Sequence, residues 1–180
     1  MAMVVSVTSA TADTGKTTVA VELVTCFARR GLRVAALKHT RGRVEMDRPG
    51  SDTDRFAAAG ARTVVISAPE RLVRLETPEH ERELREILPS LEDHDVVVVE
   101  GYKGSDLPKV VVYREAKGVA FPSGLSSIIA VVSDDTVPEA IPRFGFDEVE
   151  HLAGWLLNGL SRPAGAPPAS AGAPPAGAGG

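Results

Sequence analysis

The residues with the clearest chemical pattern form the octapeptide ATADTGKT, at positions 10–17. It matches the phosphate-binding loop GxxxxGK[ST], except that Ala10 stands where the first glycine is usual. In such a loop, successive backbone N–H groups surround phosphates at the start of a helix, the lysine contacts the outer phosphates, and the final hydroxyl binds Mg²⁺. The pattern therefore predicts that this segment binds a nucleoside triphosphate or a related phosphate.

Each position of this loop has an expected role. Lys16 is expected to contact the outer phosphates and take part in catalysis, Thr17 to bind Mg²⁺, and Thr18 to reach an inner phosphate. The backbone N–H groups expected around the phosphates belong to the preceding residues, Ala12, Asp13, Thr14 and Gly15. Ala10 adds a Cβ that costs about 1 kcal/mol if a positive φ is needed there. We expect this substitution to affect affinity rather than the fold.

A second group of residues lies where a buried strand is predicted to end. Four consecutive valines lead directly into Glu100 and Gly101. In phosphate-loop proteins an acid at this place contacts Mg²⁺ through water, and a glycine lets the chain approach the γ-phosphate. We therefore expect Glu100 to be a metal-binding and catalytic acid and Gly101 to line the nucleotide site.

A third segment, residues 45–55, is rich in acids and arginines and follows the second predicted strand. Two interpretations are open. Asp47 or Asp52 could hold metal or water beside the triphosphate, because ligands bind at the carboxyl ends of strands in open α/β sheets. Alternatively, the segment is a solvated loop in which Asp52 caps the next helix. Composition alone favours the solvated loop.

The elements that must position these residues are short runs of β-branched residues alternating with helical patterns. Most runs are apolar on successive residues, which is typical of strands covered on both faces. The run at 71–76 alternates, and it follows the preceding run closely, which predicts an antiparallel hairpin at one edge of the sheet. We predict an α/β protein with a three-layer, P-loop NTPase-like fold and a mostly parallel sheet. The other strands are expected at 4–8, 33–37, 63–67, 96–99, 110–113 and 128–132.

Helical patterns fill the intervals between the strands. Helices are expected at 16–30, from 52 to 60, from 77 through 88, and at 147–160. The third is expected to begin at Thr77 and Pro78, a cap followed by a proline in the first turn. Cys26 lies beside the apolar stripe of the first helix, and we expect it to be a small buried hydrophobe rather than a reactive thiol.

Composition limits the number of domains, the partners and the compartment. The chain has 180 residues, one cysteine and a formal net charge of -4. We expect one nucleotide-binding domain over residues 1–160 and a disordered tail rich in Ala, Gly and Pro over 161–180. The mild acidity argues against nucleic-acid binding through a broad basic face, and no run approaches the roughly 20 apolar residues of a membrane-spanning helix. The single cysteine fits a reducing compartment. We expect a cytoplasmic protein that uses neither nucleic acid nor membrane.

Taken in order, these motifs resemble those of the molybdopterin-guanine dinucleotide biosynthesis protein B family (MobB). The resemblance covers nearly all of residues 3–160. Its most distinctive segments are EGYK and DxPGxDT, since many unrelated proteins share the phosphate loop. The matching segments are the loop, LKHT at 37–40, DxPGxDTxR at 47–55, VVVEGYK at 97–103, Pro108 with Lys109, IIAVVSDD at 128–135 and FGFD at 144–147.

The resemblance implies a homodimeric, GTP-binding adaptor with Mg²⁺ and slow GTP hydrolysis. It implies work beside the guanylyltransferase that makes the guanosine nucleotide form of the molybdenum cofactor, and hence contact with a molybdopterin-type cofactor. It also implies that Asp47, Asp52 and Arg55 belong to a loop that closes over the nucleotide or the partner. Ser133 and Asp134 are our candidates for reading the guanine edge, because a carboxylate can accept from both N1–H and the exocyclic amino group.

The sequence departs from the usual family pattern at three positions. Glycine is usual at Ala10, aspartate is common at Glu45, and lysine is common at Ser51. Two other functions stay open. A small-molecule kinase or ATP-dependent synthetase of the P-loop class would begin with the same loop, although no lid with paired arginines follows the third predicted helix. The second is a pure interaction module whose phosphate loop is vestigial, which would explain why Ala10 replaces the usual glycine.

Overall fold

A computed structural model describes residues 2–42, 44, 48–115, 120–122, 124–138 and 140–160. Asp47 and the tail at 161–180 lie outside the described residues, as does Glu45. The chain divides into two compact units: one is built from the segments before Thr40 and after Pro89, and the other is Thr40–Pro89. The expectation of a single domain over residues 1–160 stays a prediction. No helix in the described part of the chain is long and apolar enough to cross a membrane.

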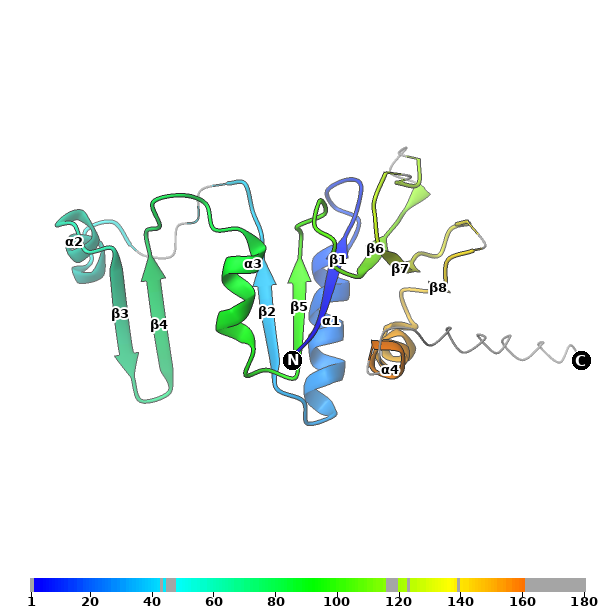
Figure 1. Ribbon diagram of the computed structural model, residues 1–180, viewed down its shortest axis with the longest axis horizontal. Helices are drawn as coiled ribbons and strands as arrows, with labels where there is room; N and C mark the ends of the chain where they lie inside the picture. The colour runs from blue at the N-terminus through cyan, green and yellow to red at the C-terminus, as the bar shows by residue number, and fades with distance from the viewer. Residues whose placement is uncertain are drawn as a thin grey trace, which may run out of the picture. The chain divides into compact units, whose positions relative to one another are not determined.

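The first unit is built on a six-stranded sheet in which every pairing is parallel. The strand order is β2-β5-β1-β6-β7-β8, so β5 and β2 lie on one side of β1 and the other three strands on the opposite side (Figure 1). Because the strands are parallel, all their carboxyl ends meet at one edge. The strands are β1 (Met3–Thr8), β2 (Val34–Lys38), β5 (Val96–Glu100), β6 (Lys109–Val112), β7 (Ile128–Val132) and β8 (Arg143–Phe144).

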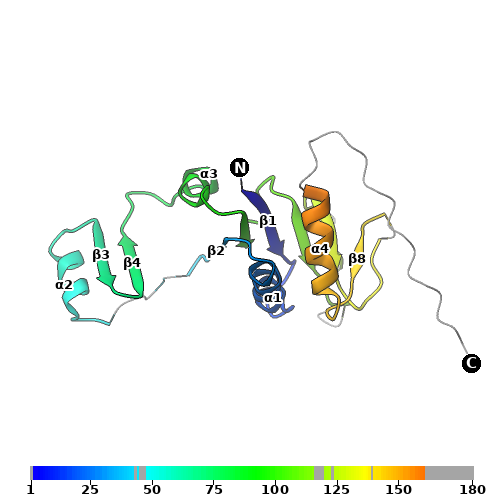
Figure 2. The ribbon, with the colours of Figure 1, turned by 90° about the horizontal axis from the view of Figure 1, so that it is seen from below.

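Two helices of this unit, α1 (Lys16–Arg29) and α4 (Val149–Leu160), lie side by side (Figure 2). Their apolar side chains join those of one face of the sheet in a single core. Phe27 of α1 and Leu152 of α4 are fully buried in it. Valines of successive positions along β5 are all buried, which is the pattern that predicted a parallel sheet covered on both faces.

The second unit contains α2 (Asp52–Ala58), β3 (Thr63–Ala68), β4 (Arg71–Glu76) and α3 (Leu84–Ile87), and a 3₁₀ turn, η1 (Leu88–Leu91), follows α3. The predicted hairpin is present, with antiparallel pairs from Thr63 opposite Glu76 to Ala68 opposite Arg71. It forms a two-stranded sheet of its own, separate from the six-stranded sheet. Alternation predicts that two strands pair with each other, but it does not determine which sheet they join.

Most predicted elements are present, with ends shifted by one or two residues, but the third helix is much shorter than expected. Residues 77–83 are not helical. Thr77 N–H donates instead to Arg62 O at 2.9 Å, which extends the hairpin pairing past β4. The helix begins only after Glu83, whose N–H donates to Glu86 Oε2 at 2.7 Å in a capping box. The two-residue strand β8 was not predicted, because a strand so short has no periodicity to read.

Candidate phosphate-binding site

The predicted phosphate loop connects β1 to α1 at the carboxyl edge of the sheet. Asp13 and Gly15 have positive φ angles of 55° and 94°, which curve the loop. Ala10 does not have a positive φ, so its Cβ causes no backbone strain. Within the part of the chain that the structure describes, no side chain caps α1, whereas α2 is capped by the Ser51 hydroxyl, which accepts from Asp54 N–H at 3.2 Å. The first N–H groups of α1 are therefore free of side-chain partners and favour an anion.

The Thr11 carbonyl is the point at which the loop is held together. The ammonium of Lys16 donates to Thr11 O at 3.1 Å, and the Ser9 hydroxyl donates to the same oxygen at 2.5 Å. Lys16 Nζ is thus held against the loop, where it can contact a phosphate. Thr14 is 2% exposed, and its hydroxyl has no hydrogen-bond partner among the described residues. Because the side chain of Thr14 is buried, only its backbone can contribute to binding a phosphate in the loop.

A polar cluster lies beside the loop and consists of Thr17, Glu100 and Lys38. The hydroxyl of Thr17 is 3.0 and 3.1 Å from the two carboxylate oxygens of Glu100, and Lys38 Nζ is 3.5 Å from Glu100 Oε1. Strand register produces this arrangement, because Glu100 lies opposite Val7 of β1 and opposite Lys38 of β2. A hydroxyl and a carboxylate are oxygen donors of the kind that Mg²⁺ prefers, so these two residues fit that ion.

Gly101 turns the chain sharply after β5. Its φ is 107°, its N–H donates to Val7 O at 3.2 Å, and its carbonyl accepts from the Ser6 hydroxyl at 2.9 Å. The neighbouring rings of His39 and Tyr102 have centroids 4.3 Å apart. In this structure the N–H of Gly101 continues the pairing of β5 with β1. Its contact with the γ-phosphate stays a prediction.

The candidates for reading guanine lie just after β7. Ser133 is fully buried, and its hydroxyl accepts from Asp135 N–H at 3.0 Å. Asp134 is exposed, and its Oδ1 accepts from Phe146 N–H at 3.3 Å. Of the two residues, only Asp134 has a side chain accessible to a ligand, and its role as a base-reading group stays a prediction.

The remaining metal candidates belong to the second unit. Asp52 is in the first turn of α2 and forms an ion pair with Arg55 at 3.5 Å, with both side chains largely exposed. The residue that caps α2 is Ser51, so the interpretation in which Asp52 is the cap was wrong. The described part of the chain contains no group of three or more His, Cys, Asp or Glu side chains arranged to hold a metal. Metal binding by Asp52 stays a prediction.

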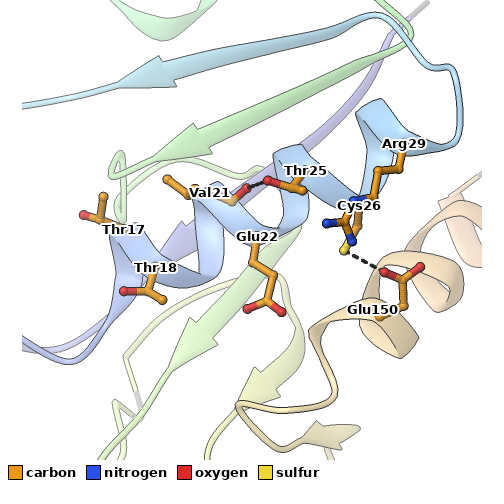
Figure 3. Close-up of a pocket in the computed structure, with 8 residues that line it drawn as sticks. All are labelled: Thr17, Thr18, Val21, Glu22, Thr25, Cys26, Arg29 and Glu150. Atoms are coloured by element: carbon orange, nitrogen blue, oxygen red, sulfur yellow. Dashed lines mark hydrogen bonds between the residues drawn. The ribbon is translucent and has the colours of Figure 1, made fainter.

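A pocket of about 510 Å³ extends along α1, from Thr17 and Thr18 at its start to Cys26 and Glu150 at its far end (Figure 3). Cys26 Sγ donates to Glu150 Oε2 at 3.2 Å, and Arg30 Nη2 is 2.5 Å from Glu150 Oε1. Burial, together with the hydrogen bond to Glu150, raises the pKa of the Cys26 thiol. The prediction of a buried cysteine is confirmed, and its contacts join α1 to α4.

Two residues of this edge, Arg114 and Phe146, were not among the predicted site residues, whereas the position of Lys38 near a strand end predicted that it adds positive charge to the phosphate site. Lys38 is the last residue of β2, and only the pairing of β2 with β5 brings it to Glu100. Arg114 and Phe146 follow β6 and β8 and contact the loop from the other side. Phe146 lies in the FGFD segment that carries the family resemblance, whereas nothing local marked Arg114.

The parallel sheet, the loop that connects β1 to an uncapped helix, and the acid that ends the adjacent strand together define a P-loop NTPase-like fold. The family described as "Molybdopterin guanine dinucleotide synthesis protein B" (MobB) matches residues 4–134, and the chain belongs to this family.

Relatives and solved structures agree with this assignment. The chain is 30% identical over 164 residues to the "Molybdopterin-guanine dinucleotide biosynthesis adapter protein" of Escherichia coli, covering 87% of this chain and 93% of that one. A crystal structure of "molybdopterin-guanine biosynthesis protein B" has a TM-score of 0.70 at 28% identity and covers 87% of this chain and 99% of its own. A MobB homologue from Bacillus stearothermophilus has a TM-score of 0.65 at 26% identity, covering 88% and 97%.

Proposed function

We propose that this chain is an adapter protein in the biosynthesis of molybdopterin-guanine dinucleotide and that it binds GTP with Mg²⁺. The adapter role is supported by the similarity to the adapter protein of Escherichia coli along nearly the whole of both chains. Nucleotide binding is supported by one observation above all: the contact between Thr17 and Glu100 beside the uncapped start of α1. That contact lies next to the N–H groups that we propose bind the phosphates.

The side chains around the loop divide the work of holding a triphosphate. Backbone N–H groups of residues 12–18 would surround the phosphates, and Lys16 would exchange Thr11 O for a phosphate oxygen. Thr17 and Glu100 would hold Mg²⁺, which supplies charge neutralisation between the outer phosphates. Lys38 would balance part of the carboxylate charge.

We propose that hydrolysis of GTP is slow. Both carboxylate oxygens of Glu100 lie about equally close to the Thr17 hydroxyl, at 3.0 and 3.1 Å, which supports a role for this acid in holding the proposed metal together with Thr17. A general base must instead reach the attacking water. With slow hydrolysis, the chain would work as a switch or an adapter rather than as a metabolic enzyme.

Nucleotide binding is tested by titrating labelled GTP and ATP, each with Mg²⁺, against the full chain and Lys16→Ala. Loss of a charge-assisted hydrogen bond is expected to weaken GTP binding by about 10-fold or more. Arg71→Ala is the matched control, because it removes one positive charge from the hairpin of the second unit. Preference for ATP with phosphate transfer to a metabolite would favour a kinase, and absence of binding to either nucleotide would overturn the proposal.

The proposed assembly has its own tests. We propose a cytoplasmic homodimer that works beside the guanylyltransferase and the molybdopterin-type cofactor. Light scattering on the full chain should give the mass of a dimer, and a monomer at micromolar concentration would contradict it. Co-sedimentation with the guanylyltransferase should increase when GTP and Mg²⁺ are present, and complete independence from nucleotide would argue against a nucleotide-controlled adapter.

A further inference from the structure

Arg114 and Phe146 form a stacked pair against the phosphate loop. The guanidinium carbon of Arg114 lies 3.8 Å from the centroid of the Phe146 ring. Arg114 Nε donates to Thr14 O at 3.2 Å, and a Cβ on Gly15 would lie 3.4 Å from Phe146 Cε1. Both side chains are half-buried. The pair therefore contacts the loop at its last two residues before α1, with part of its surface open to solvent.

Three separate segments bring this pair to the loop. Arg114, Asp134 and Phe146 each lie two residues past the end of a strand, namely β6, β7 and β8. The Oδ1 atom of Asp134 accepts from Phe146 N–H at 3.3 Å, which fixes the backbone that carries the ring. All three lie at the carboxyl edge, where ligands of open α/β sheets bind.

The residues on the two sides of the loop indicate which way a bound nucleotide would point. Thr17, Glu100 and Lys38 lie on the side of β5 and β2, so the Mg²⁺ and the outer phosphates of the proposed nucleotide belong there. The nucleoside end must then extend away from β5. Arg114 and Phe146 lie on the opposite side of β1, after β6 and β8.

Resting on the proposed function, we infer that Arg114 and Phe146 form the surface on which the nucleobase of the bound nucleotide stacks. Bases stack on aromatic rings and on guanidinium planes, and such stacking accepts any base. Among the described residues, the guanidinium of Arg114 donates only the single hydrogen bond from Nε to Thr14 O. Its terminal nitrogens add positive charge close to the inner phosphate. The pair supplies affinity for a nucleoside, and any choice between guanine and adenine must come from other groups.

The experiment compares two probes, Mg²⁺-GTP and Mg²⁺-tripolyphosphate, by calorimetric titration of the full chain. Phe146→Leu keeps an apolar side chain against Gly15 but removes the flat ring. Loss of stacking should weaken GTP binding by about 5- to 100-fold, while tripolyphosphate affinity changes less than about 2-fold, since that probe carries no base. Arg114→Gln should also weaken GTP more than tripolyphosphate. Phe121→Leu is the matched control, because its ring packs on Tyr113 at 5.5 Å.

The outcomes separate this inference from the proposed function. If the wild-type chain binds neither probe, the proposed function fails and this inference fails with it. If the wild-type chain binds GTP and Phe146→Leu binds it equally well, the inference alone is overturned. Equal weakening of both probes would also overturn it, since the pair would then act by holding the loop through Thr14 and Gly15.

Discussion

Replacing Gly101 by alanine tests whether the turn after β5 depends on the absence of a side chain. Gly101 has a φ of 107°, where side-chain-bearing residues are strained. A Cβ there would also lie 3.1 Å from His39 Cβ and 3.3 Å from His39 O. The second contact is with backbone, which cannot rotate away. Both effects act at the residue that follows Glu100, so the substitution would disturb the end of the strand that positions the acid.

The two effects give the expected magnitude. The backbone strain contributes about 1–2 kcal/mol, and the crowding against His39 contributes about 1–2 kcal/mol more. The free energy of unfolding should therefore fall by about 2–4 kcal/mol. For a chain of this size, each kcal/mol lowers the melting temperature by about 2–4 °C, so a fall of roughly 4–16 °C is expected.

Thermal unfolding followed by circular dichroism measures this effect, with two other glycines of the same unit as controls. Gly31 has a φ of 77° and nothing within 4 Å of its Cβ position, so Gly31→Ala isolates the backbone strain. Gly154 lies inside α4, has open space around its Cβ position and no positive φ, so Gly154→Ala should not destabilise. A melting temperature of Gly101→Ala no lower than that of Gly31→Ala would refute the contribution of His39.

Three further predictions concern single side chains. Glu100→Gln should leave GTP binding mostly intact and slow phosphate release, and unchanged release would remove this acid from the proposed site. Because burial raises the pKa of Cys26, alkylation by iodoacetamide at pH 8 should be at least about 10-fold slower in the native than in the guanidinium-unfolded chain; equal rates would show an accessible thiol. Hydrogen bonds from Arg33 lower the pKa of Asp95, so its stabilising contribution is present above its ordinary pKa of about 4 and is lost as the pH falls through the lowered value. Asp95→Asn should flatten the loss of stability below pH 4, and an unaltered acid titration would contradict this.

The local patterns of the sequence predicted the parts of the site that are continuous in the chain. The phosphate loop occupies the predicted place between β1 and α1, and Glu100 ends a buried strand as expected. The same kind of reasoning failed at Thr77, whose N–H continues the hairpin pairing with Arg62. A proline near a polar residue is typical of a helix start, but a hydrogen bond to a residue far along the chain outweighed that local preference.

The sequence by itself thus determined the order of the elements, the buried strands and the loop, because runs of valine, helical spacing and glycine positions act over a few residues. The tertiary structure decided which strand ends meet. The order β2-β5-β1-β6-β7-β8 places Glu100 beside Thr17 and Lys38, and it brings Arg114 and Phe146 to the other side of the loop. Parallel neighbours are joined by long crossovers, so the pairing of β1 with β5 depends on how the helices pack between distant strands. That packing, rather than any local pattern, assembled the site.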